Sequence, residues 1–232
     1  MQFQYTIALL GQYAAAALEN AGQLLKEASL LFAERHQARA YFLAVAAIEE
    51  IGKAALAFEG QGRNLKDSAV ISKLRHAMDN HTQKINSALT LILLASPDPR
   101  QALMPTLDLM IRVKSGREPS MYTDINYESG EVKQPMTVVG DVAARDCIRL
   151  GNDCLRAAKK HMTETKPLLR SASDNALFAM KSEQLGKILK SEGFWRYYIE
   201  RMEAGDKDYA AAVTTYQREY LAKKRAYQKL PG

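Results

Sequence analysis

Apolar residues recur every three or four positions through about the first 115 residues, and this spacing constrains the fold more than any other feature. It is the period of an α-helix that buries one of its faces. Glycines and prolines such as Gly60, Gly62, Pro97 and Pro99 interrupt the pattern where helices end. The spacing therefore predicts an all-α bundle of long antiparallel helices, over residues 5–32, 38–60, 67–95 and 100–113.

The segment 115–136 departs from this period. Residues 121–127 alternate between apolar and polar positions, as a short strand would, and Glu128-Ser129-Gly130 is a plausible turn toward Val132. We expect a loop or small hairpin inserted in the helical body, and long connections of this kind are often functional.

Helical spacing returns over residues 140–166, and a linker over 167–174 follows. Further helices are predicted over 175–190, 194–204 and 206–230. We therefore expect a helical domain of residues 1–166, carrying the insertion at 115–136. A helical C-terminal extension, residues 167–232, is expected to pack on it.

Composition excludes several classes of protein. The chain is 47% hydrophobic and 25% charged, which is unlike a disordered segment, and its net charge of +6 permits contact with nucleic acid or an acidic protein. Cys147 and Cys154 form no CxxC pair, so we expect free thiols, no metal and no cofactor. There is no signal peptide and no apolar run of about 18 residues, so we expect a cytoplasmic protein without membrane contact.

Arg75 and His81 are the first candidates for chemistry. RNA is cut without metal when its 2′-OH attacks the adjacent phosphorus, while a histidine moves protons and an arginine stabilises the phosphate charge. On one continuous helix, residues six apart point about 120° away from each other. Both would reach one phosphate most easily in a two-fold homodimer, where symmetry-related copies line a shared cleft. We therefore expect a dimer interface that includes the second and third predicted helices.

Other interpretations of these two residues remain open. His81 lies between Met78 and Ile85 on the apolar stripe, where a histidine often belongs to the core. Arg75 and Asp79 are spaced as an ordinary surface ion pair. His76 could also take the role given to His81.

Glu49, Glu50 and Lys53 lie within the otherwise apolar second helix. A carboxylate there could orient Arg75 or His81 from a neighbouring helix. Alternatively, Glu49 and Lys53 form an i, i+4 pair and Glu50 is solvated. A di-iron bundle is excluded because the chain contains no Glu-x-x-His. Motifs of serine hydrolases and nucleotide-binding loops are also absent.

The last predicted helix interleaves tyrosines with basic residues. Such a helix could stack bases and hold phosphates, or it could dock its tyrosines on the bundle or across a dimer. The tyrosines are Tyr209, Tyr216, Tyr220 and Tyr227, and the candidate RNA-binding residues are Lys223, Lys224, Arg225 and Lys229.

Several segments, in this order, resemble the AbiV family of bacterial abortive-infection proteins, a branch of the HEPN superfamily. They are the aromatic-led helix Tyr41–Ala55 with Glu-Glu-x-Gly-Lys-Ala, the His-x-x-Lys of His81–Lys84, and the Arg117-Glu118 that precedes Met121-Tyr122-Thr123-Asp124. The hallmark of the superfamily is an arginine, four to six residues, then a histidine. The resemblance covers about residues 10 to 165.

The resemblance implies a HEPN-like bundle whose catalytic pair is Arg75 and His81. Glu49, Glu50, Lys53 and Lys84 would frame this pair. It further implies an antiphage effector that cleaves RNA as a homodimer without metal, leaves 2′,3′-cyclic phosphates, and acts once infection is sensed. The alternative is a non-catalytic HEPN module that senses a phage protein or sequesters a host factor.

Overall fold

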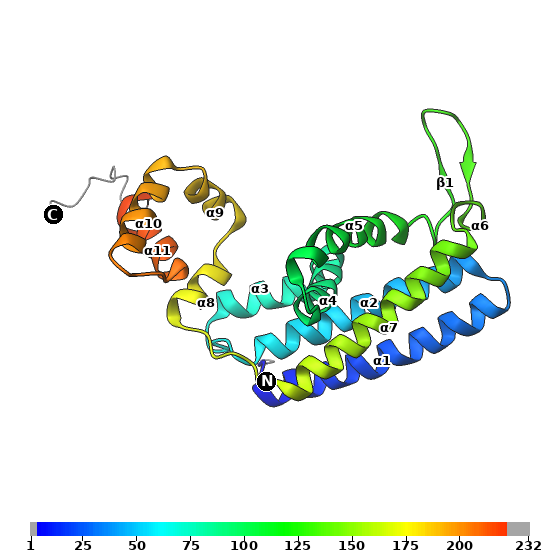
Figure 1. Cartoon of the computed structure of the whole chain (residues 1–232), viewed down its shortest axis with the longest axis horizontal. Helices are drawn as coiled ribbons and strands as arrows, with labels where there is room; N and C mark the ends of the chain where they lie inside the picture. The colour runs from blue at the N-terminus through cyan, green and yellow to red at the C-terminus, as the bar shows by residue number, and fades with distance from the viewer. Residues whose placement is uncertain (1–3, 222–232) are drawn as a thin grey trace. The chain divides into compact units, whose positions relative to one another are not determined.

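A computed structural model describes residues 4–221 and confirms the all-α class (Figure 1). The chain forms two compact units. The first combines the residues up to Gln61 with Leu74–Leu168, and the second combines Gly62–Lys73 with the chain from Leu169 onward. Among the residues described, no helix is long and apolar enough to cross a membrane.

Three long helices run beside one another in the first unit: α1 (Ile7–Ala33), α2 (Gln37–Gly60) and α7 (Asp141–Glu164) (Figure 1). α2 is buried along most of its length, and Val45, Ile48 and Ile51 have no exposed surface. The core that surrounds them includes both cysteines of α7, which are free thiols as predicted. The apolar stripes seen in the sequence thus meet around α2.

The single helix predicted over residues 67–95 is wrong in one respect, because the helix is interrupted at Asn80. α3 (Ser68–Asp79) ends there and α4 (His81–Ala95) begins. Asn80 has an extended backbone, and its side chain accepts a hydrogen bond from the Gln83 amide at 3.0 Å, as an N-cap asparagine does. Arg75 and His81 therefore lie on different helices, and the 120° separation of a continuous helix does not apply to them.

α4 crosses α2 at very short range. A Cβ atom on Gly52 would lie 1.9 Å from the carbonyl oxygen of Lys84, so only glycine permits this approach. α5 (Pro99–Arg117) is capped by Asp98 and packs against α4. It extends past the predicted end at residue 113, so that Arg117 belongs to its last turn.

The predicted small hairpin is confirmed. β1 (Asp124–Ile125) pairs antiparallel with β2 (Val132–Lys133), and Gly130 in the turn has a φ of 72°. The hairpin projects from the first unit next to the short helix α6 (Pro135–Val138) (Figure 1). Its strands are shorter than the alternating pattern suggested.

The second unit contains α8 (Ala172–Ala179), α9 (Ser182–Leu189), α10 (Glu192–Glu203), α11 (Tyr209–Tyr216) and a π-helical turn, Gln217–Leu221. The helix predicted over 175–190 is interrupted at Met180, whose ψ of 138° is extended. Phe194, Val213 and Tyr216 lie in this unit's own core, so the described part of the tyrosine stripe packs there. Tyr227 and the predicted RNA-binding residues lie outside the described residues: Lys223, Lys224, Arg225 and Lys229.

Candidate functional site

Cationic side chains from two helices converge on one buried carboxylate, that of Glu49 on α2. One of its oxygens, Oε2, lies 2.7 Å from His81 Nδ1 and 2.8 Å from Lys84 Nζ, both on α4. The other oxygen, Oε1, accepts a hydrogen bond from Arg117 Nε on α5 at 2.7 Å. Glu49 itself is only 7% exposed. We call these four residues the Glu49 cluster.

Local sequence features produce this convergence. Gly52, three residues after Glu49, lets the backbone of α4 come against α2. The Asn80 cap makes His81 the first residue of α4, and Lys84 follows on the same face one turn later. Arg117 reaches the carboxylate of Glu49 because α5 remains helical beyond residue 113, so that its last turn includes Arg117.

The cluster keeps Glu49 ionised. Burial raises the pKa of this carboxyl, but the hydrogen bonds and charges of Lys84 and His81 outweigh burial, and the pKa is lowered overall. An ionised carboxylate can only accept hydrogen bonds, so His81 Nδ1 must carry the proton that it shares with Glu49. The other ring nitrogen, Nε2, then holds a lone pair when the imidazole is neutral.

The fixed imidazole is open to solvent. The side chain of His81 is 52% exposed, so the structure places it outside the core, contrary to the alternative drawn from its apolar neighbours in the sequence. A histidine that a carboxylate orients and whose side chain is exposed can accept a proton from a bound molecule or donate one to it.

Two cations lie next to the histidine. Lys84 and Arg117 both pair with Glu49, and Arg117 Nη1 also lies 4.0 Å from Oε1 of the exposed Glu118. Lys84 is buried, whereas the Arg117 side chain is 22% exposed and its guanidinium carbon lies 6.0 Å from the centre of the Phe42 ring. An anion next to His81 could therefore accept hydrogen bonds from the N–H groups of Arg117 that Glu49 does not occupy.

Glu50 and Lys53 form a neighbouring pair. Their charged atoms lie 2.5 Å apart, and both side chains are half-buried. Burial lowers the pKa of Lys53, but the hydrogen bond and charge of Glu50 outweigh it and raise the pKa overall. The i, i+4 pair between Glu49 and Lys53 is not formed, because Glu49 faces α4 and α5.

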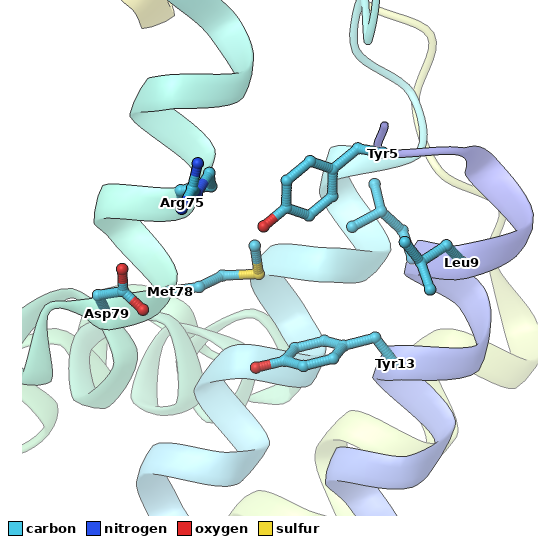
Figure 2. A pocket seen from close by; sticks show the side chains of 7 residues that line it. Tyr5, Leu9, Tyr13, Arg75, Met78 and Asp79 are labelled. Carbon is cyan, nitrogen blue, oxygen red and sulfur yellow. The ribbon is translucent and has the colours of Figure 1, made fainter. Parts of the chain in front are cut away.

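Arg75 lies on α3 beside a half-open hollow of about 260 Å³ in the first unit (Figure 2). Tyr5, Tyr13, Met78 and Asp79 line the same hollow. Within residues 4–221, Arg75 forms no ion pair with Asp79 and no hydrogen bond with His81. The neighbouring His76 is exposed on the same helix.

Arg117 is the cluster residue that was not among the sequence candidates. It is separated from Glu49 by 68 positions, and no periodicity connects the two. A signal was nevertheless present, because Arg117 belongs to one of the segments that carry the family resemblance.

A second arginine–histidine pair was also overlooked. Arg156 and His161 on α7 have four residues between them, which satisfies the HEPN hallmark spacing. Arg156 pairs with Asp153, and His161 packs edge-on to Phe58 with Nε2 3.8 Å from Glu59 Oε1. This pair provides an internal comparison for experiments on His81. Across the described chain, no three His, Cys, Asp or Glu side chains gather as a metal site.

Comparison with known proteins identifies the family of this chain. A family model described as HEPN_AbiV, AbiV, matches residues 10–156, more than half of the chain. The matched span contains the whole Glu49 cluster together with Arg75. No curated protein and no solved structure matches the chain significantly.

Proposed function

Because the chain belongs to the AbiV family of HEPN proteins, we propose that it is an abortive-infection effector that arrests growth by cleaving RNA. The observation that supports this best is the exposed side chain of His81, which is oriented through Nδ1 by the same Glu49 carboxylate that Lys84 and Arg117 contact. The three segments of the family resemblance supply all four residues of this cluster.

The proposed reaction is attack of a ribose 2′-oxygen on the adjacent phosphorus. A histidine Nε2 takes the 2′-OH proton, the O2′–P bond forms, and the P–O5′ bond breaks as a proton reaches the departing O5′. The products are a 2′,3′-cyclic phosphate and a 5′-OH. Arg117 would hold the phosphate from within the protomer, and Arg75 would bind the same strand.

We further propose that the protein acts as a two-fold homodimer. Proton removal from O2′ and proton delivery to O5′ occur on opposite sides of the phosphorus, and two copies of His81 could divide these tasks. α2 is largely buried within its own protomer. We therefore place the interface on the exposed faces of α3, α4 and α5 rather than on the second helix.

A specific observation also favours the rival, a non-catalytic module that binds a phage protein or a host factor. Lys84 is 5% exposed, and its contact with Glu49 joins α2 to α4 independently of any chemistry. The same cluster can therefore hold α2 and α4 together beneath a binding surface without taking part in catalysis.

Cleavage of cellular RNA by purified protein in EDTA separates the two functions. We expect wild type to cut and to leave 2′,3′-cyclic phosphate ends, His81→Ala to lose at least about a hundredfold in rate, and His161→Ala to retain activity. The matched plaque assay compares the same three proteins during infection. If folded His81→Ala still protects cells from phage, the rival function is correct.

A further inference from the structure

The hollow beside Arg75 combines apolar and charged walls in a way that the proposed cleavage does not use. In Figure 2, Tyr5, which precedes α1, and Tyr13, on α1, extend toward α3, and Met78 lies between them. Arg75 and Asp79, one turn apart on α3, border the same space. Its volume of about 260 Å³ is suited to one flat heterocycle with part of its sugar rather than to an extended peptide.

The apolar part of the hollow suits an aromatic ring. Met78 is 6% exposed and presents its thioether between the tyrosines, and sulfur packs favourably against aromatic faces. The tyrosine rings provide further surfaces for stacking, which is a common way to hold an unpaired base. Burial raises the pKa of Tyr13, so its phenol stays protonated and can donate a hydrogen bond.

The charged part of the hollow discriminates among bases. Arginine recognises guanine by donating two hydrogen bonds to O6 and N7. A carboxylate accepts hydrogen bonds only, and guanine offers N–H donors at N1 and N2. Adenine keeps N7 and has an N6 amino donor, but it lacks O6 and the adjacent N1 and N2 donors, so Arg75 and Asp79 would each lose one of the two hydrogen bonds that guanine offers.

The hollow is also adjacent to the Glu49 cluster. Asp79 lines it and His81 is two residues further along the chain, so their Cα atoms are at most about 7 Å apart. A nucleotide whose base occupied the hollow could therefore bring a neighbouring phosphate close to His81.

We propose that this hollow is a nucleobase subsite that selects guanine in single-stranded RNA, with Arg75 and Asp79 as the specificity-determining residues. The inference rests on the proposed function, because that function is the reason to expect the guanine to come from RNA. Free guanine nucleotides present the same chemistry, and the experiment therefore includes both sources.

Titration calorimetry tests the subsite without any need for cleavage. The probes are GMP, AMP, and two non-cleavable 2′-O-methyl hexanucleotides that contain one guanine or one adenine. We expect wild type to prefer each guanine probe by about tenfold, as one good bidentate contact provides, and to bind the RNA more tightly than GMP. Tighter binding of GMP than of the guanine RNA would overturn the assignment to RNA.

Substitutions identify the residues that are responsible for the preference for guanine over adenine. Asp79→Asn should bring the guanine-to-adenine ratio close to one, whereas Asp108→Asn, an exposed aspartate on α5, should leave it unchanged. Arg75→Gln should act like Asp79→Asn, with Arg100→Gln as its control. Equal affinity for the guanine and adenine probes in wild type, or a ratio unaffected by Asp79→Asn, would overturn the proposal.

The experiments can refute the proposed nuclease activity and the proposed guanine subsite independently. His81-dependent cleavage without guanine preference would remove the subsite and leave the nuclease. Selective binding of the guanine RNA by a protein that cuts no RNA would remove the nuclease and leave the subsite as part of a binding module.

Discussion

Glu49 acts mainly by compensating the charges of the side chains that contact it. Lys84 is buried beside it, and a buried cation without a counter-charge is far more costly than a well-paired one. Loss of the carboxylate would also release Arg117 and leave the His81 ring free to rotate. Stability and the proposed chemistry therefore depend on the same side chain.

Glu49→Gln should lower the free energy of unfolding by about 3 kcal/mol, because it removes one partner of a buried pair. The adjacent Glu50→Gln is the matched control. Its pair with Lys53 is half-buried, so it should cost no more than about 1 kcal/mol. Urea unfolding of the three proteins measures both values, and equal losses in the two variants would contradict the special role of Glu49.

The same carboxylate predicts a pH dependence. Its pKa in the folded protein lies below the ordinary value of 4.5. Its contribution to stability is therefore complete above pH 4.5 and is lost as pH falls through the lower, folded pKa. The difference in unfolding free energy between wild type and Glu49→Gln should shrink over this range, because protonated glutamate resembles glutamine. Urea titrations from neutral pH down to about pH 3 test this, and a constant difference would refute it.

At the residue scale, part of the site could be predicted from the sequence. Glu49, His81 and Lys84 were candidates because they lie within short segments of family resemblance. The contact between Glu49 and Arg117 could not be predicted, since it depends on where α5 ends relative to α2. Helical periodicity gives the face of a residue but not its partner on a distant element.

At the scale of elements, apolar spacing located nearly every helix because the buried faces of α1, α2, α4 and α7 are long and regular. The breaks at Asn80 and Met180 were not found, because the apolar stripes continue across both positions. Asn80 did carry a local signal, since asparagine is a favoured N-cap. In the sequence, the continuous apolar stripe is a stronger signal than one N-cap asparagine. Only the structure shows that α3 and α4 are two separate helices.

The crossing of α2 and α4 predicts a strong effect at Gly52. In Gly52→Ala the new methyl would collide with the Lys84 backbone at 1.9 Å, and backbone cannot move aside as a side chain can. We expect a loss of about 3 kcal/mol or more, together with displacement of Lys84 and His81 from Glu49.

Gly11→Ala on α1 is the control for this substitution, because its Cβ would meet only Gln61 at an ordinary 3.7 Å. That variant should be neutral or slightly stabilising, since alanine favours the helix more than glycine does. Thermal and urea unfolding compare the two variants. A Gly52→Ala protein as stable as Gly11→Ala would show that α4 can move away from α2 without cost.

At the scale of the whole molecule, α5 presents an exposed apolar face. Leu103, Met104, Leu107 and Ile111 are each more than 40% exposed, and Leu94 at the end of α4 is 65% exposed. Clusters of this kind often mark a protein–protein interface. The helix that bears this face ends in Arg117, so a second copy bound there would lie close to the Glu49 cluster.

We therefore expect light scattering to show a dimer of wild type and a monomer of the double variant Leu107→Glu, Ile111→Glu, because two carboxylates would have to be buried in the interface. Leu30→Glu is the control: this residue on α1 is 68% exposed and lies on another helix, so its substitution should leave the dimer intact. The monomeric variant should retain its helical circular dichroism but lose RNA cleavage. Full cleavage by the monomer would show that one copy of His81 is sufficient and that the two-fold site is unnecessary.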